Sequence, residues 1–309
     1  MAKEKRYAIG VDIGGTNMPC SLLDESGQMI HTVEKRTLPE QGPDDVVSRI
    51  SDSVIELSNY FKEHIKNGVI LGVGIGAPGA LDHKKGEIIT SPNLAGWENV
   101  PIIRLLEQKI KMPVKMDNDA NCAVLGEHWA GAAKGFKNVI LITLGTGVGG
   151  GIIIEDKIYR GSHGTAGEIG HITIIADGAK CACGNYGCLE TYASATAAVR
   201  MAREKLKISK DITAHDIFLK AEAGDTAYAD ILKESGRYLG IGIATLANIF
   251  DPDAIIIGGG FFRAEKYLMP SAIDEAYKRS FKSVMDKIKI TAAKLGNDAG
   301  IIGAANLLF

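Results

Sequence analysis

The sequence predicts an α/β protein with two lobes, and three observations lead to this fold class. The 309 residues exceed an ordinary domain of about 100 to 200 residues, so two lobes are the first expectation and one oversized domain is the alternative. Short apolar strands alternate with helices in the first half of the chain. A buried strand that enters a glycine turn and returns as a second strand occurs twice, within 7–23 and within 139–154.

The composition is that of a soluble globular protein. Hydrophobic residues make up 46% of the chain and charged residues 23%, which is enough apolar surface for a core and too much for a disordered chain. The formal net charge is -2 and no block of Lys or Arg stands out, so we expect neither nucleic acid nor membrane as a partner. The N-terminus has no secretory pattern, which predicts a cytoplasmic protein.

In the first half of the chain, apolar runs between turn signals predict strands, and apolar residues three and four positions apart predict helices. The expected strands are 7–12, 20–23, 69–75 and 114–116, and the expected helices are 44–66 and 120–133. Pro43 and Asp44 mark the beginning of the first helix, and Asn67-Gly68 mark its end.

The second half begins with the repeated strand pair and is then mainly helical. We expect strands at 139–143, 152–154 and 254–257, and helices at 194–206, 214–223 and 228–249. The small residues of 298–305 indicate a closely packed terminal helix. The expected domains are a small lobe of residues 1–117, completed by the C-terminal helix at 297–309, and a large lobe of residues 118–296.

Glycine-rich loops follow three of the strands. Their residues are Gly14, Gly15 and Thr16; Gly145, Thr146, Gly147 and Gly149; and Gly258, Gly259 and Gly260. The second loop formally matches the dinucleotide pattern Gly-x-Gly-x-x-Gly, but that pattern must open a helix and here a strand follows. A plain hairpin turn would explain one such loop. Three of them favour backbone cradles for a polyphosphate.

Carboxylates at two strand ends are candidates for chemistry. Asp12 directly precedes the first glycine loop, where a carboxylate can hold Mg²⁺, although an isolated turn residue has no such role. Asn118 and Asp119 follow a strand and precede a helix, so spacing alone favours a helix N-cap. The competing role is that of a general base, which accepts a hydroxyl proton as a phosphoryl group is attacked.

A metal site is predicted near the middle of the chain. Four soft or borderline ligands lie within eighteen positions, namely His171, Cys181, Cys183 and Cys188. Tetrahedral zinc prefers four ligands of these types. Three unrelated thiols and a surface histidine are the alternative. With all four positions taken by protein, the zinc would be structural. Glu168 and Glu190 flank the site and are either solvated surface carboxylates or, once oriented by the metal, acceptors for sugar hydroxyls.

With these motifs in order, the chain resembles the sugar kinases of the repressor, open reading frame, kinase (ROK) family, most closely its glucokinase-like members. The segments that carry the resemblance over nearly the whole length are 12–16, 93–97, 118–121, 144–151, 167–171, 181–190 and 258–260. The resemblance implies a two-lobed actin-like, ribonuclease H-like (ASKHA) α/β fold with a duplicated core and an interlobe cleft. This agrees with the repeated strand pair.

The resemblance also implies roles for individual residues. Asp119 would be the base that takes the proton from the 6-hydroxyl of the sugar. The sugar would be bound by Gly79, Asn93, Asn118, Glu168, His171 and Glu190, and His171 would also join the three cysteines on zinc. The loops at 14–16 and 145–149 would hold the ATP phosphates with Mg²⁺ near Asp12, and 258–260 would approach the adenosine.

One departure from the family pattern follows the first glycine turn. The segment is Asn17-Met18-Pro19-Cys20, where many relatives have a Lys and then small or β-branched residues. Proline cannot donate a hydrogen bond within a sheet, so we expect the strand that contains Pro19 to be bulged or to lie at an edge.

The function that the resemblance implies is ATP-dependent phosphorylation of a hexose at its 6-hydroxyl, with glucose as the first expectation. N-acetylmannosamine, N-acetylglucosamine, mannose and fructose are alternative substrates. A sugar-responsive repressor would carry an additional N-terminal DNA-binding domain, and here the first strand begins at about Tyr7 without a preceding basic module. A sugar sensor would lack the base. The family suggests a homodimer or a homotetramer.

Overall fold

The computed structural model describes residues 4–91, 94, 96–208 and 211–309 and divides into two compact units. Unit 1 comprises Met1–Gly135, Lys157–Ala166 and Lys294–Phe309, and unit 2 comprises Phe136–Asp156 and Gly167–Ala293. The boundary expected after residue 117 differs from this division. The helix that follows residue 118 belongs to unit 1 because it packs against the C-terminal helix of the chain.

Unit 1 is built on a five-stranded sheet of order β3-β2-β1-β4-β8. Its strands are β1 (Arg6–Asp12), β2 (Asn17–Asp24), β3 (Met29–Arg36), β4 (Val69–Ala77) and β8 (Val114–Asn118). β1 pairs antiparallel with β2 and parallel with β4, and β4 pairs parallel with β8. A separate three-stranded sheet consists of β5 (Ala80–Asp82), β6 (Glu87–Thr90) and β7 (Glu98–Val100).

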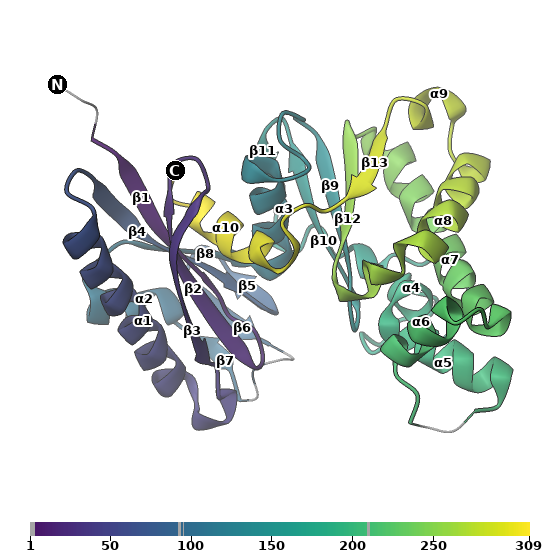
Figure 1. The fold of residues 1–309 in the computed structure, drawn as a ribbon, viewed down its shortest axis with the longest axis horizontal. Helices are drawn as coiled ribbons and strands as arrows, with labels where there is room; N and C mark the ends of the chain where they lie inside the picture. Colours follow the sequence, from purple (N-terminus) through teal and green to yellow (C-terminus); the bar gives the residue numbers. More distant parts are fainter. Residues whose placement is uncertain (1–3, 92–93, 95, 209–210) are drawn as a thin grey trace. The chain divides into compact units, whose positions relative to one another are not determined.

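Helices cover both faces of this sheet (Figure 1). They are α1 (Pro43–His64), α2 (Ile102–Ile110), α3 (Asp119–Ala130) and α10 (Ala299–Asn306), with 3-10 turns η1 (Pro39–Gln41) and η4 (Gly296–Asp298). Alternate residues of a strand point to opposite faces. Ile9 and Val11 of β1 therefore belong to the core cluster that contains residues of α1, whereas Ala8 packs with Ile301 of α10.

The close packing expected for the terminal helix is confirmed, and glycine makes it possible. A Cβ atom added at Gly303 of α10 would lie 1.6 Å from the carbonyl oxygen of Cys122 in α3. A Cβ atom added at Gly74 of β4 would lie 1.8 Å from the carbonyl oxygen of Ala304. These distances leave no room for a side chain, so α10 lies directly on the backbones of α3 and of the sheet.

Gly303→Ala should lower the free energy of unfolding by at least about 1–3 kcal/mol, the usual cost of overpacking, because the added methyl group forces α10 away from α3. Chemical denaturation measures the loss. Gly145→Ala is the matched control, since no atom lies within 4 Å of the Cβ position there and its φ is not positive. Equal stability of the two variants would contradict the close contact.

Unit 2 repeats the same arrangement of strands. Its strands β9 (Val139–Leu144), β10 (Val148–Ile154), β12 (Ala254–Gly258) and β13 (Lys289–Ala292) follow one another in the sheet in the order β10-β9-β12-β13. The short strand β11 (Lys157–Ile158) belongs to unit 1. β9 pairs antiparallel with β10 and parallel with β12, as β1 does with β2 and β4. The duplicated core that the repeated strand pair indicates is therefore present.

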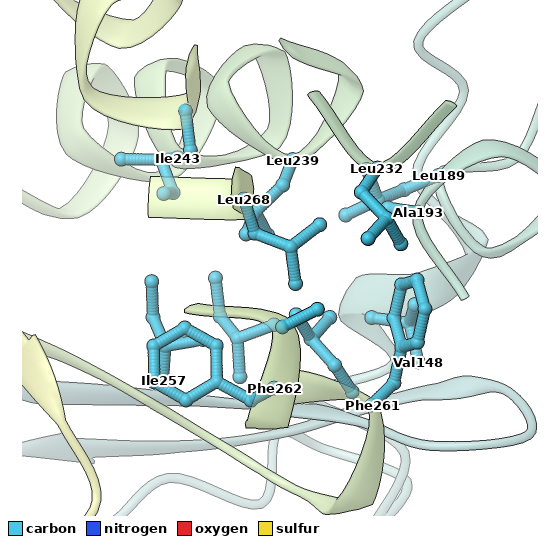
Figure 2. Packing of buried hydrophobic residues seen from close by; sticks show 14 of the residues in the cluster. Val148, Leu189, Ala193, Leu232, Leu239, Ile243, Ile257, Phe261, Phe262 and Leu268 are labelled. Atoms are coloured by element: carbon cyan, nitrogen blue, oxygen red, sulfur yellow. The ribbon is translucent and has the colours of Figure 1, made fainter. Parts of the chain in front are cut away.

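The remainder of unit 2 is mainly helical. Its elements are η2 (Ile169–His171), α4 (Glu190–Ala193), α5 (Ala195–Leu206), α6 (Ala214–Glu222), α7 (Thr226–Phe250), η3 (Gly260–Ala264), α8 (Glu265–Arg279) and α9 (Lys282–Met285). Leu239 and Ile243 of α7 and Leu268 of α8 lie over Phe261 and Phe262 in one buried cluster (Figure 2). Among the described residues, no helix is long and apolar enough to cross a bilayer.

The expectation that the strand containing Pro19 is bulged or lies at an edge is met only locally. β2 lies between β3 and β1, so it is not an edge strand. The irregularity in its pairing with β3 falls between Leu22 and Leu23. Proline is accommodated because pairing with β1 begins only at Cys20, so Pro19 has a paired strand on one side alone.

Candidate functional site

The turn from β8 into α3 separates the two roles that the sequence left open. Asn118 is the N-cap of α3, and its Oδ1 accepts the N–H of Ala120 at 3.0 Å. Asp119 is the first residue of the helix, is exposed, and also accepts this N–H at 2.8 Å. Asn118 therefore provides the cap, and the carboxylate of Asp119 lies at the surface where a hydroxyl group could reach it.

A buried carboxylate that the sequence analysis did not identify supports this turn. The side chain of Asp117 has no exposed surface, and its Oδ1 accepts the backbone N–H of Asn118 and the Nδ2 of Asn121, both at 2.8 Å. Its Oδ2 accepts from Arg160 at 2.7 Å from Nε and 2.6 Å from the nearer terminal nitrogen. Arg160 thus neutralises the carboxylate that orients the Asp117–Asn118 peptide, at the start of the turn that leads to Asp119.

Two further residues expected at the sugar belong to this part of the chain. The Nδ2 of Asn118 donates to the carbonyl oxygen of Gly79 at 3.4 Å, so the structure brings these two together. Gly79 has a φ of 101°, and a Cβ atom there would lie 2.2 Å from the carbonyl oxygen of Thr90. Only glycine fits this turn. Asn93, also expected to bind the sugar, lies outside the described residues.

Asp12 lies close to the candidate base. Burial, and then the negative charge of Asp119, raise the pKa of Asp12 to about 7. The carboxylate therefore pays a desolvation cost when ionised, which a bound cation would offset. The two acidic residues for which the family resemblance implies roles in Mg²⁺ binding and proton transfer are thus electrostatic neighbours within unit 1.

The first glycine loop is held in place by a residue that was not predicted. Thr37 is buried, its Oγ1 donates to the carbonyl oxygen of Gly14 at 2.6 Å, and its N–H donates to the carbonyl oxygen of Thr16 at 2.8 Å. Gly15 and Thr16 are exposed. The loop is therefore fixed from below by Thr37 while its outer surface is open to a ligand.

The second glycine loop is a tight connection between β9 and β10 (Gly145–Val148), and we call it the phosphate hairpin after the role that the sequence analysis expected for it. The N–H of Gly145 donates to the carbonyl oxygen of Gly147 at 2.9 Å, and β10 begins at Val148. A strand and not a helix follows, as the sequence indicated, so this is not a dinucleotide-binding turn of the Rossmann type.

A cavity of about 530 Å³ lies beside the phosphate hairpin in unit 2. Its lining combines two predicted glycine loops with residues that were not predicted, namely Gly145, Thr146, Ala195, Ala214, His215, Phe218, Gly260, Phe261, Arg263 and Ala264. Gly259 has a φ of 94°, and a Cβ atom there would lie 2.3 Å from the carbonyl oxygen of Leu144. This glycine lets the end of β12 approach β9 and so shapes one wall of the cavity.

The structure brings the four expected metal ligands together. The ligand atoms of His171, Cys181, Cys183 and Cys188 all lie within 4.8 Å of one another. Two of the separations are 3.7 Å, between the Sγ atoms of Cys183 and Cys188 and between the Sγ of Cys181 and the Nδ1 of His171. Zn–S bonds of about 2.3 Å in a tetrahedron place two sulfur atoms about 3.8 Å apart. The four residues, which we call the metal cluster, therefore fit zinc.

The two flanking glutamates have different surroundings. The exposed Glu168 has its Oε2 3.8 Å from the Nε2 of His171, the ring nitrogen that faces away from the metal cluster. The Oε2 of Glu190 accepts the N–H of Val148 at 3.0 Å, and its Oε1 lies 3.9 Å from the Sγ of Cys181. Glu190 therefore lies between the metal cluster and the phosphate hairpin, which its position in the sequence did not indicate.

The residues missed by the sequence analysis share one property. Arg160 is 43 positions from Asp117, and the cavity residues His215, Phe218 and Arg263 come from α6 and η3. None belongs to a motif. An arginine near a predicted strand end is too common a feature to single out, and no pattern along the chain marks these side chains as neighbours.

Comparison with known proteins gives consistent results. The model of the ROK family matches residues 8–309. A glucokinase of Halalkalibacterium halodurans is 40% identical over 317 residues, which cover 98% of this chain and 95% of that protein. A xylose repressor of Caldicellulosiruptor bescii is 34% identical over 313 residues, which cover 97% of this chain and 77% of the repressor.

A solved structure is similar over nearly its whole length. It is that of a ROK family glucokinase from Streptomyces griseus in complex with glucose and AMPPNP, with a TM-score of 0.79 and 36% sequence identity. The similarity covers 97% of this chain and 98% of that one.

Proposed function

The chain belongs to the ROK family, and we propose that it transfers the γ-phosphoryl group of ATP to the 6-hydroxyl of a hexose, with glucose as the substrate. The observation that carries this proposal is the exposed carboxylate of Asp119 at the start of α3, beside the buried Asp12, at a helix whose cap is supplied by Asn118. The similarity to glucokinases over nearly the whole chain supports the choice of glucose.

In the reaction, Asp119 acts as the general base. The 6-oxygen of the sugar attacks the γ-phosphorus, the bond from that phosphorus to the bridging oxygen of the β-phosphate breaks, and ADP leaves. Asp119 accepts the proton of the hydroxyl group. Mg²⁺ near Asp12 would neutralise charge on the phosphate oxygens. Asp117, paired with Arg160, accepts the N–H of Asn118 and so holds the turn that leads to the base.

The sugar is bound by hydrogen bonds from side chains and backbone. The residues that we assign to it are Gly79, Asn93, Asn118, Glu168, His171 and Glu190. His171 suits a double role because its Nδ1 faces the metal cluster and its Nε2 faces Glu168. A carboxylate beside an imidazole can accept sugar hydroxyl hydrogens while the imidazole donates or accepts according to its tautomer.

The nucleotide is bound by backbone groups. We assign the phosphates to Gly14, Gly15 and Thr16 and to Gly145, Thr146, Gly147 and Gly149, and the adenosine to Gly258, Gly259 and Gly260 with the cavity next to them. The cavity of about 530 Å³ is within the usual size of sites for small ligands, which is about 300–1,000 Å³. Its aromatic wall, Phe218 and Phe261, offers apolar contact to a purine.

We assign a structural zinc ion to the metal cluster. Cys183→Ser removes one ligand, so the metal content should fall, and the affinity for glucose should fall with it because Glu168 and His171 lose their support. Metal analysis and isothermal titration calorimetry check the two results. Tyr186→Phe, an exposed change within the same loop, is the control and should keep both. Normal glucose affinity in a metal-free variant would contradict the link.

A second function is favoured by one observation. A xylose repressor is 34% identical over 97% of this chain, so a sugar-binding regulator is the alternative from another class. Within the enzyme class, N-acetylmannosamine, N-acetylglucosamine, mannose and fructose are the alternative substrates.

The proposal also includes a location and an assembly. We propose that the kinase acts in the cytoplasm, at the entry of glucose into glycolysis, and that it is a homodimer or homotetramer. Analytical ultracentrifugation tests the assembly.

The experiment that tests the function is release of ADP from Mg·ATP by zinc-loaded protein, run in parallel with glucose and the four alternative sugars. Fastest turnover with glucose is the expected result. A preference for an acetamido sugar would keep the mechanism and change the substrate. Binding of a sugar without turnover on any of the five would favour the regulator.

A further inference from the structure

We propose that residues Cys188–Thr196, which we call the coupling segment, transmit the state of the metal cluster to the phosphate hairpin, so that a bound metal ion raises the affinity for nucleotide. This inference rests on the proposed function, because it concerns the same nucleotide. It assigns the metal a role beyond the orientation of the sugar. All the residues involved belong to unit 2.

The coupling segment holds the phosphate hairpin through three hydrogen bonds. The N–H of Val148 donates to the Oε2 of Glu190 at 3.0 Å, and the N–H of Ala195 donates to the carbonyl oxygen of Gly145 at 2.9 Å. The Oγ1 of Thr196 donates to the carbonyl oxygen of Thr146 at 2.7 Å. Three of the four hairpin residues are thus fixed by a segment that begins with the metal ligand Cys188.

The other metal-bearing segment touches the same hairpin. Gly170 precedes the ligand His171, and a Cβ atom added at Gly170 would lie 2.1 Å from the carbonyl oxygen of Val148. Ile169, Val148 and Leu189 belong to one buried cluster, in which Figure 2 shows Val148 and Leu189. Val148 is therefore in contact with the segment that carries His171 and with the segment that carries Cys188.

A metal ion would join these two segments directly. Hydrogen bonds in which sulfur takes part are weak, so such bonds alone would hold the four ligands together less firmly than ligation of one ion. Ligation fixes His171 and Cys188 relative to each other. The two chain segments that carry these ligands, and that both contact Val148, are then fixed as well. A hairpin fixed in advance loses less conformational freedom when it binds phosphates, so its affinity for nucleotide rises.

The first test measures nucleotide affinity directly, without sugar and without turnover. Zinc-loaded protein and protein stripped with EDTA are titrated with a non-hydrolysable ATP analogue and excess Mg²⁺ by calorimetry. We expect the dissociation constant to rise at least about fivefold on stripping, which is the lower end of usual coupling between sites, and to return when Zn²⁺ is restored. Equal affinity in the two states overturns the inference.

The reciprocal measurement starts from zinc-loaded protein. Linkage requires the nucleotide analogue to raise the affinity for Zn²⁺ by the same factor, which competition with a chromophoric chelator measures on folded, zinc-loaded protein. An unchanged zinc affinity overturns the inference. If zinc-loaded protein binds no nucleotide at all, the proposed function itself fails, so the two failures are distinguishable.

A pair of threonine variants tests the route. Thr196→Val removes the hydrogen bond to Thr146 and touches no metal ligand, so it should keep the zinc content and reduce the coupling factor. Thr245→Val is the matched control, because its Oγ1 also donates to a backbone carbonyl oxygen, that of Ile241 in α7. The control should keep the full factor. A full coupling factor in Thr196→Val overturns the assigned route.

Discussion

Asp119→Asn should lower the turnover number at least about 10²-fold, because a general base contributes about 10² to 10⁴ to the rate. The affinities for glucose and for nucleotide should stay nearly unchanged. Asparagine has the same shape and keeps an oxygen that can accept the N–H of Ala120, so the start of α3 is preserved. Steady-state kinetics with Mg·ATP and glucose, together with calorimetry of each ligand, check the two halves of this result.

Asp225→Asn is the control for Asp119→Asn. Asp225 is the N-cap of α7 and accepts the N–H of Ala227 at 3.0 Å, so it shares the local geometry at a helix start without an assigned chemical role. Its replacement should leave turnover unchanged. Near-normal turnover in Asp119→Asn would instead assign Asp119 to the helix terminus alone and leave the reaction without a base.

The same variant has a second readout in Asp12. The charge of Asp119 is one of the two causes that raise the pKa of Asp12 to about 7, and burial is the larger one. Removing the charge should lower that pKa without returning it to the ordinary value, since burial remains. Carboxyl-carbon NMR titration measures the shift. An unchanged pKa would show that the two carboxylates do not interact.

The sequence predicted most of the duplicated sheet because its signals are local. The glycine turns at 14–16 and 145–147 each join two apolar strands, and the structure has both strand pairs. β3 was missed because its residues are mostly half-exposed or exposed at the edge of the sheet and carry no apolar run. Helix α8 was missed because Pro270 interrupts its pattern.

In the candidate site, too, the features with a local signal in the sequence were predicted, and the contacts between distant residues were not. Four ligands within eighteen positions formed the metal cluster because a short loop can bring them together. The contact of Glu190 with Val148 spans 42 positions, and that of Arg160 with Asp117 spans 43. Such contacts depend on how segments far apart in the chain pack together, which no spacing along the chain encodes.

Arg160→Met should lower the free energy of unfolding by about 3 kcal/mol, because it removes the arginine that pairs with the buried carboxylate of Asp117 and leaves His83, whose Nε2 is 3.9 Å from Oδ1, as the nearby basic side chain. We place the loss at the low end of the usual range of about 3–5 kcal/mol because the side chain of Arg160 is 36% exposed, so water partly screens the pair. Turnover should fall as well, since Asp117 accepts the N–H of Asn118 and so orients the turn that leads to Asp119. Denaturation curves and kinetics on the same preparation measure both.

Arg49→Met is the matched control for Arg160→Met. Arg49 also pairs with an aspartate, Asp45, but that carboxylate is 36% exposed while the side chain of Asp117 is fully buried. Arg49→Met should lower the free energy of unfolding by no more than about 1 kcal/mol. Adding Asp117→Asn to Arg160→Met should recover part of the stability, because the neutral amide removes the unpaired charge. If Arg160→Met and Arg49→Met lowered the free energy of unfolding by the same small amount, the prediction that burial of Asp117 makes Arg160 important for stability would be wrong.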